Sequence, residues 1–340
     1  MPKYTISRTE ADVAKHWKGF TDYVALETAT GGPDPHLKFL GHLIDEDDVD
    51  DRERLWRILC YVGCYNTAGA QVVWQRFPHA GGPPTIKFVS EHWTGIPLRK
   101  ERRPVRSREK LTQYFTAAHG WVERYHDRVR SMSYDELWDA LDDDLFGVGR
   151  YIGMRFLEAL RLHYGAEGRM YDLRPRGGWG SKLTVTYLYP EFDEQLNRSP
   201  ENSRNNATAN AIGREIKDAL EDDYGIALDW YTLETLLCNY RQALGKGKYP
   251  GAPHDSELEY AQKAVDYWND GFDLAPMLRA RAAMFPHRCL GELNGWHGQR
   301  KELYGTRDLY GFFWSDLVYS YHHTVDIANP VRWSDVGGGA

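Results

Sequence analysis

The clearest structural signal in the chain is SYDELWDALDDDLFGVGRYIGMRFLEAL, residues 133–160. Ser133, followed three positions later by Glu136, has the pattern of a capping box, which predicts that a helix begins there. The turn 146–149, Phe-Gly-Val-Gly, ends this helix, and apolar spacing predicts a second helix over 150–164. The stretch therefore predicts two helices joined by a tight glycine turn.

This glycine turn is suited to hold a phosphate group. Gly147 and Gly149 permit backbone torsions and a close approach that a side chain would block. The second helix begins with amide donors and the positive end of its dipole, and Arg150 adds a charge. We expect Gly147, Gly149, Arg150 and Tyr151 to contact DNA, with an ordinary helix–helix turn as the alternative.

Charge is unevenly distributed along the chain. A net charge of −7 argues against a protein that coats nucleic acid without specificity. The run 99–110, RKERRPVRSREK, is nevertheless basic at seven of its twelve positions. We expect Arg102, Arg103 and Arg106 of this basic strip to contact phosphates, with a solvated loop as the alternative.

The remaining sequence predicts a mainly helical protein with two regions. Residues 1–195 hold the hairpin and the basic strip, and residues 211–336 form a helical C-terminal lobe that completes the active site. A polar loop at 196–210 separates them. The periodicity predicts helices at 8–27, 55–64, 68–75 and 111–131, a short strand at 86–89, and either a strand or a helix at 182–189.

The cysteines and the hydropathy pattern exclude two classes of protein. Cys60, Cys64, Cys238 and Cys289 lack the spacing of zinc or iron–sulfur ligands, so we expect reduced, buried thiols and no metal site. No apolar run approaches the roughly 18 residues that span a bilayer, and no apolar signal segment opens the chain. The sequence therefore predicts a cytoplasmic protein with no membrane partner.

The stretch 133–160 resembles the helix-hairpin-helix of base-excision DNA glycosylases. Those enzymes place a catalytic Asp beyond the second hairpin glycine, at the mouth of a pocket for a flipped base. Asp172 lies 23 residues after Gly149 and matches that position with a small insertion. Many bifunctional members carry a nucleophilic Lys two residues after the glycine, where this chain has Tyr151. The resemblance implies a glycosylase-like fold with further helices, and the Tyr argues against Schiff-base chemistry.

A wider part of the chain is similar to the phage alpha-glutamyl/putrescinyl thymine pyrophosphorylase family. The similar segments are TGGPDP (30–35), YVGCYNTAGAQVVW (61–74), ERRPVRSREKL (101–111), LFGVGRYIG (145–153), DLRPRGGWGSKL (172–183) and LETLLCNYRQALGKGKYPG (233–251). The resemblance implies an amino acid:DNA transferase that acts on 5-pyrophosphoryloxymethyl-uracil. Such an enzyme flips the base, releases pyrophosphate and attaches an amine, often that of an amino acid.

Two groups of residues fit this chemistry. An amine nucleophile needs a proton acceptor, and departing pyrophosphate needs cations, which are Arg, Lys or a divalent metal such as Mg²⁺. The first group offers Asp172 as the catalytic carboxylate, with binding residues Arg174, Arg176, Trp179 and Lys182. The second offers Glu234 as a further catalytic carboxylate, with binding residues Asn239, Arg241, Lys246, Lys248 and Tyr249. Surface loops are the alternative for both groups.

The sequence thus leads to one main hypothesis and two alternatives. We expect a monomeric transferase without a bound cofactor, whose partners are double-stranded DNA carrying activated hydroxymethyluracil and a free amino acid. If a phage encodes the chain, it works in the host cytoplasm. The alternatives are a monofunctional DNA glycosylase that uses Asp172, and a noncatalytic DNA-binding protein that uses the hairpin alone. Glycine, serine, glutamate and a polyamine all stay open as the amine.

Overall fold

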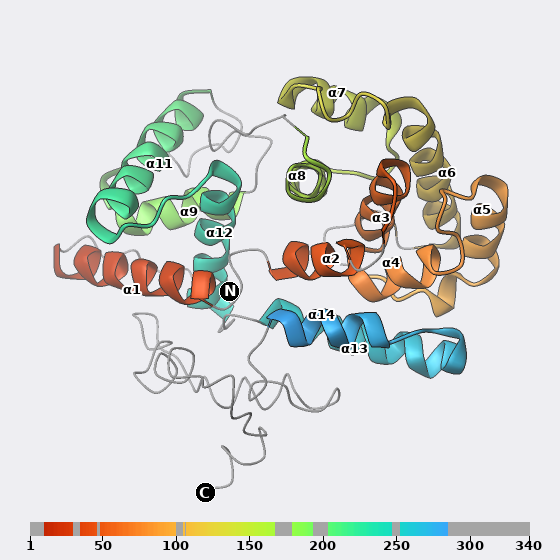
Figure 1. Cartoon of the computed structure of the whole chain (residues 1–340). Helices are drawn as coiled ribbons and strands as arrows, with labels where there is room; N and C mark the ends of the chain where they lie inside the picture. Colours follow the sequence, from red (N-terminus) through yellow and green to blue (C-terminus); the bar gives the residue numbers. More distant parts are fainter. Residues whose placement is uncertain are drawn as a thin grey trace, which may run out of the picture.

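The computed structural model describes residues 10–29, 35–45, 48–99, 105, 107–166, 179–192, 203–246 and 252–284 (Figure 1). These residues form helices, turns and loops, with no strand among them, which confirms the expected mainly helical class. The elements are α1 (Glu10–Ala29), α2 (Pro35–Asp45), α3 (Asp51–Cys64), α4 (Thr67–Trp74), α5 (Gly82–Glu91), η1 (Trp93–Gly95), α6 (Arg108–Tyr125), α7 (Tyr134–Asp144), α8 (Arg150–Ala159), η2 (Leu160–Tyr164), α9 (Trp179–Leu188), η3 (Pro190–Phe192), α11 (Ser203–Tyr224), α12 (Trp230–Lys246), α13 (Ala252–Trp268), η4 (Asn269–Gly271) and α14 (Ala275–Met284).

The helix α5 replaces the short strand that the sequence predicts at 86–89. Two prolines occupy the first turn of α5, where a missing amide hydrogen costs a helix nothing. Thr85 and Val89 are both buried, and their separation of four residues places them on one helical face. The prediction of a strand was therefore wrong, because four residues are too few to distinguish the two periodicities.

The segment 182–189, for which strand and helix were both open, is part of α9. Thr184, Val185 and Leu188 are buried on its face toward α12, and the Thr184 hydroxyl donates to the carbonyl of Leu237. Packing against α12 thus outweighs the strand preference of the β-branched residues. The expected polar loop at 196–210 is helical from Ser203 onward, because α11 continues upstream of its buried face.

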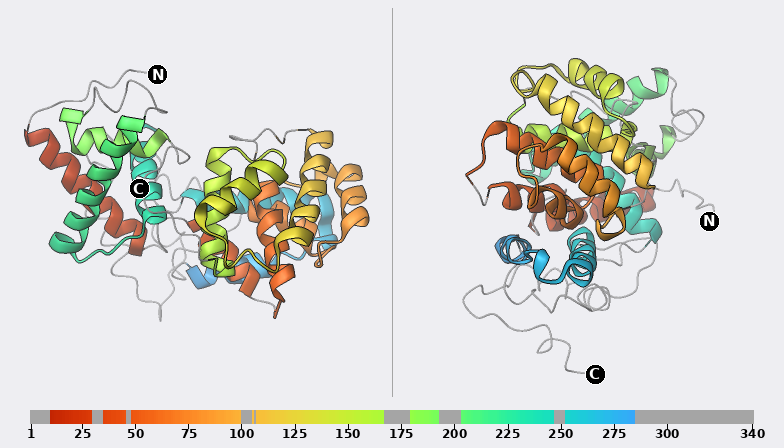
Figure 2. Two further views of the ribbon diagram at one scale, coloured as in Figure 1. Left: turned by 90° about the horizontal axis from the view of Figure 1, so that it is seen from above. Right: turned by 90° about the vertical axis from the view of Figure 1, so that its right-hand side faces the viewer.

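A larger lobe comprises α2 to α8 together with α13 and α14 (Figures 1 and 2). Aromatic residues dominate its core: Trp56, Tyr114, Trp121 and Trp138 are among the largest fully buried side chains. Trp56 Nε1 donates to the carbonyl of Phe77, and Trp121 Nε1 donates to that of Ala140. These bonds satisfy the polar ends of the buried indoles, as a dry core requires.

A smaller lobe comprises α1, α9, α11 and α12 (Figure 1). Its core contains Phe20, Ile216, Leu236 and Tyr240, which come from α1, α11 and α12. The Tyr240 ring lies edge-on to Phe20 at a centroid distance of 5.4 Å. Gly19 permits this approach, since a Cβ there would lie 2.9 Å from the Tyr240 hydroxyl.

The two lobes interleave along the chain. The order of the described helices is α1 in the smaller lobe, α2–α8 in the larger, α9–α12 in the smaller, and α13–α14 in the larger. The sequence instead predicts contiguous regions at 1–195 and 211–336. Helical periodicity shows that a face is apolar but does not identify the helix that will cover it.

Candidate functional site

The glycine turn joins α7 to α8 in the predicted manner. Ser133 and Glu136 form both bonds of the capping box, with Ser133 N to Glu136 Oε2 at 2.7 Å and Glu136 N to Ser133 Oγ at 3.3 Å. These backbone and side-chain hydrogen bonds to Ser133 lower the pKa of the Glu136 carboxyl. The Leu145 amide then donates to Leu141 O at 3.1 Å and ends α7.

The backbone conformation of the turn favours glycine at position 147, whereas position 149 has room for a side chain. Gly147 has a φ of +75°, which a residue with a side chain adopts only at a cost. Gly149 has a φ of −87° and is the N-cap of α8, with open space where a Cβ would lie. It has no side chain to cover the first amides of α8, so these amides are placed to meet an anion.

Close packing of α7 on α8 makes the hairpin stiff. A Cβ on Gly153 would lie 2.5 Å from the ring of Trp138, so the glycine lets the indole of α7 pack directly on the backbone of α8. About one turn further along the same face of α8, the Phe156 ring packs edge-on against Trp121 at 5.2 Å. The turn is therefore held between two helices whose separation is set by buried aromatic rings.

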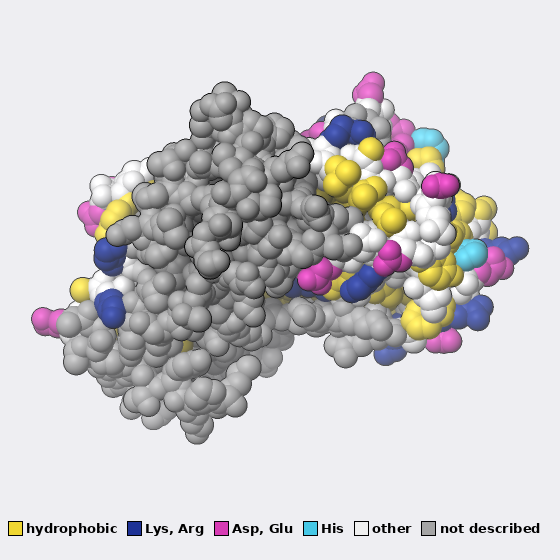
Figure 3. Space-filling model, turned by 90° about the horizontal axis from the view of Figure 1, so that it is seen from below, with side chains coloured by type: hydrophobic (Ala, Val, Ile, Leu, Met, Phe, Trp, Pro, Cys, Tyr) yellow, Lys and Arg dark blue, Asp and Glu magenta, His cyan; other side chains and the backbone are white. Residues whose placement is uncertain are grey.

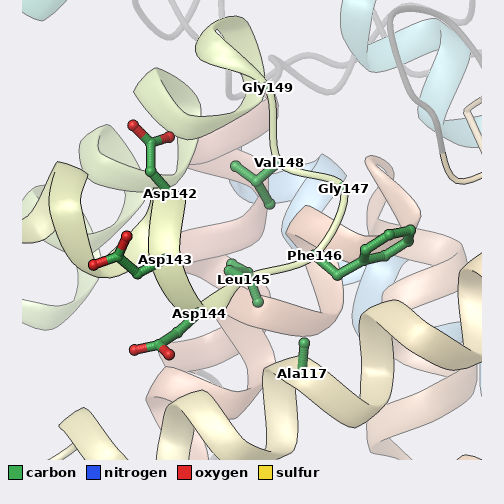
Figure 4. A pocket seen from close by; sticks show the side chains of 9 residues that line it. All are labelled: Ala117, Asp142, Asp143, Asp144, Leu145, Phe146, Gly147, Val148 and Gly149. Carbon is green, nitrogen blue, oxygen red and sulfur yellow. The ribbon is translucent and has the colours of Figure 1, made fainter.

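Three aspartates precede the turn, and they lie on the side away from its tip. Figure 4 shows the carboxylates of Asp143 and Asp144 directed away from Phe146. The Asp144 carboxylate accepts hydrogen bonds from the Tyr125 hydroxyl and the Arg124 guanidinium of α6, and these bonds lower its pKa. A cavity of about 580 Å³ lies here, lined by Ala117, Asp142, Asp143, Asp144, Leu145, Phe146, Gly147, Val148 and Gly149. The aspartates and the turn thus line one cavity, and two of the three carboxylates are directed away from Phe146.

Tyr151 occupies the first turn of α8 and opens a buried polar network. It accepts a 2.9 Å hydrogen bond from the Tyr65 hydroxyl, and the two rings meet edge-on at 6.0 Å. Burial raises the pKa of the Tyr65 phenol well above its usual value, which keeps this phenol protonated as a donor. Tyr65 ends α3 with a φ of +53°, a conformation that non-glycine residues adopt rarely and often near functional sites.

The network continues through Arg155 into the smaller lobe. Arg155 Nη1 lies 2.5 Å from Glu158 Oε2 and 2.7 Å from Thr235 Oγ1, and Arg155 Nη2 lies 3.7 Å from Glu234 Oε2. All four residues are buried, and the guanidinium carbon also lies 5.5 Å from the Tyr151 ring centre. Glu234, a predicted catalytic residue on α12, is thus brought against α8.

On the other side of Tyr65, the network reaches α2, α4 and α13. The Arg99 guanidinium lies over the Tyr65 ring at 5.0 Å and has Nη1 3.1 Å from His36 Nε2. His36 Nδ1 lies 2.8 Å from Glu257 Oε1, and Glu257 Oε2 accepts bonds from the amide and hydroxyl of Thr67. Arg99, the first residue of the basic strip, is therefore half-buried and contacts Tyr65 and His36.

Side-chain pairs also link the two lobes near this network. Arg161, which follows α8, forms an ion pair with Asp229, which precedes α12. Tyr231 of α12 is buried in the core of the larger lobe, where its ring lies 6.5 Å from that of Tyr134. The start of α12 consequently lies beside the start of α7 and the segment that follows α8.

Several predicted site residues lie outside the described residues. The larger set comprises Asp172, Arg174, Arg176, Lys248, Tyr249, Arg102, Arg103 and Arg106. For a second set the helical backbone is described and the side chain is not: Arg150, Trp179, Lys182, Arg241 and Lys246. Asn239 is half-buried on α12, one turn beyond Glu234. Among the described residues, the structure brings together Gly147, Gly149 and Tyr151 at the hairpin, with Glu234 across the network.

Sequence reasoning missed Tyr65, Arg155 and Glu158. The two charged residues stand within GMRFLEAL, an otherwise apolar run on the second predicted helix. Two opposite charges three positions apart on such a face indicate a buried pair, since isolated charges are rarely buried. Tyr65 carries no comparable local signal, because its partners lie far from it in the sequence.

Other surfaces and comparisons add little to this site. On the face shown in Figure 3, Lys and Arg side chains alternate with Asp and Glu over the described residues, without a basic patch. Over the same described ranges, no helix has the length and apolarity to cross a bilayer, and no three His, Cys, Asp or Glu side chains are grouped to hold a metal ion. Cys60, Cys64 and Cys238 are buried thiols, and Cys289 lies outside the described residues.

Comparisons of the chain with protein-family models, with curated proteins and with solved structures found no match.

Proposed function

We propose that this protein is a DNA-modifying transferase that binds duplex DNA through the α7–α8 hairpin. The observation that carries the proposal is the geometry of that hairpin. Gly147 adopts a positive φ, Gly149 leaves the first amides of α8 uncovered by a side chain, and Trp138 packs on Gly153 to hold the turn in place. Such an element presents backbone donors to a phosphate without any reorganisation on binding.

The proposed reaction replaces pyrophosphate by an amine at the C5 methylene of a flipped uracil. The C–O bond to pyrophosphate breaks, a C–N bond forms, and the attacking amine loses one proton. We assign the proton acceptor to Asp172 and the neutralisation of the pyrophosphate to Arg174 and Arg176. These residues belong to the segment of sequence that connects η2 of the larger lobe to α9 of the smaller.

The network beside the hairpin supports an enzyme over a passive DNA-binding protein. Tyr151 follows the hairpin glycine by two residues, and its hydroxyl is held by Tyr65 rather than left to solvent. The Arg155 guanidinium lies 5.5 Å from the Tyr151 ring centre, and Glu234 lies beside that guanidinium, so a carboxylate, a guanidinium and two phenols form one chain of contacts along α8. A phosphate clamp alone does not need such a set of buried, ionisable groups.

The DNA-binding part of the proposal is tested with Gly149→Ala. Since open space surrounds the Cβ position and φ is −87°, the variant should fold like the parent protein. Its methyl group stands where a phosphate would approach, so the affinity for duplex DNA should fall. Thermal unfolding of the same sample is the control. An unchanged affinity in a folded variant would remove the hairpin from the DNA interface.

The catalytic part is tested by incubating DNA that carries pyrophosphorylated hydroxymethyluracil with a pool of amino acids. Pyrophosphate release and nucleoside mass analysis should show an amino-acid adduct. Asp172→Asn should lower the rate by about 10²–10⁴-fold, the usual contribution of a general base, with DNA affinity nearly unchanged. Full activity in this variant would move the proton acceptor elsewhere, with Glu234 as the next candidate. Release of a free base instead of pyrophosphate would identify a glycosylase.

A further inference from the structure

Phe146, at the tip of the hairpin, is an exposed aromatic ring. It is 39% exposed, whereas its neighbour Leu145 is buried. Phe146 belongs to neither of the two hydrophobic cores and is not among the partly buried residues that pack against them. Figure 4 shows its ring projecting from the turn. The ring therefore adds little to the folded core.

Within the described ranges, few large apolar side chains are exposed to solvent, and these belong to different elements. They are Phe146, Leu162, Tyr224, Tyr267 and Leu278. Phe146 alone among them stands on the turn that presents backbone amides to an anion. Single exposed apolar residues need no explanation by themselves. A ring that flanks a phosphate-binding turn lies where the sugars and bases of the same strand must pass.

Three aspartates line the cavity beside the turn, and two of them face away from Phe146. The Asp143 and Asp144 carboxylates point away from the ring, and Asp144 is bonded to Tyr125 and Arg124. A polyanion that approached from the α7 side would meet these aspartates. One that approached at the tip of the turn, which Asp143 and Asp144 do not face, would meet the Phe146 ring.

We infer that Phe146 is an aromatic wedge that enters the base stack of duplex DNA next to the phosphate held by the hairpin. The inference rests on the proposed DNA binding and names the part of the duplex that the turn recognises. Apolar wedges partly unstack a base step and kink the duplex, and an exposed base gains by stacking on an aromatic ring. Because unstacking costs least at a weakened step, the protein should prefer a duplex with a mismatch.

The test compares the affinity of the full chain for a paired and a singly mismatched duplex, each with 2-aminopurine beside the central step. The parent protein should bind the mismatched duplex more tightly and increase the 2-aminopurine fluorescence as the base unstacks. Phe146→Ala should bind it roughly 5- to 100-fold more weakly, the loss expected for one base–aromatic stack, and should give no fluorescence increase. Phe146→Trp should retain both properties.

Leu162→Ala is the matched control, since Leu162 is 45% exposed, close to the 39% of Phe146, but belongs to η2 and not to the turn. It should bind like the parent protein. Phe146→Ala with unchanged affinity and fluorescence would overturn the wedge and leave DNA binding by the hairpin in place. The wedge would also be overturned if Phe146→Ala bound the mismatched duplex more weakly but still increased the 2-aminopurine fluorescence as the parent protein does. The Phe146 ring would then contact DNA outside the base stack. A parent protein that binds neither duplex would overturn the proposed DNA binding itself.

Discussion

Removing the Arg155 guanidinium should cost the protein a large part of its free energy of unfolding. It is 4% exposed, and its two carboxylate neighbours, Glu158 and Glu234, are 2% and 1% exposed. In Arg155→Met the side-chain volume is nearly kept, but both carboxylates lose their guanidinium and Thr235 loses a hydrogen bond. Breaking a buried ion pair from one side costs about 3–5 kcal/mol, because a buried charge is left uncompensated.

Urea unfolding followed by circular dichroism measures this loss. With a slope of about 3 kcal/mol per M, the midpoint should fall by roughly 1–1.7 M. The matched control is Arg52→Ala, which breaks an ion pair with Glu123 whose side chains are 43% and 45% exposed. That change should cost no more than about 1 kcal/mol, since solvent screens the pair. If Arg155→Met lost no more than Arg52→Ala, the argument from buried charge would be refuted.

Two further predictions concern the hairpin and its support. Gly153→Ala should lose about 2 kcal/mol in urea unfolding, because overpacking against the rigid Trp138 ring costs up to about 3 kcal/mol and the helix propensity of Ala returns about 1. Gly149→Ala, which has open space at the Cβ position, should stay within about 0.5 kcal/mol, and equal losses in the two variants would contradict this packing. Asp144 has a lowered pKa, so its bond to Tyr125 stabilises the fold above the usual carboxyl pKa and is lost as pH falls through the lowered value. The difference in unfolding free energy between the parent protein and Asp144→Asn should therefore disappear in acid, and a difference that persists at low pH would assign it to another cause.

The hairpin could be predicted from the sequence because all of its signals are local. The capping box and both glycines lie within 17 residues, from Ser133 to Gly149, and each acts on its immediate neighbours. The structure confirms the helices on both sides and the position of the turn. The presence of a helix was likewise predictable wherever apolar residues recurred at helical spacing over several turns.

The buried network and the arrangement of the lobes could not be predicted in the same way. Glu257 bonds to Thr67 across 190 residues of sequence, and Tyr65 to Tyr151 across 86. Such pairs depend on which helices meet, and a single sequence carries no record of that. Glu234 was predicted to be catalytic from its place among cationic residues, whereas its buried contact with Arg155 follows from the packing of α12 near α8.

The interleaved order of the lobes has a consequence for synthesis on the ribosome. Helix α1 ends at Ala29, and α12, which supplies Tyr240 to cover Phe20, begins at Trp230. About 200 residues separate them, so at roughly 5–20 residues per second the apolar face of α1 waits on the order of 10–40 s for its partner. The larger lobe lacks α13 and α14 for longer still, since both follow α12 in the sequence. The apolar face of α1 in a nascent chain is thus left without its native cover until α12 has been made.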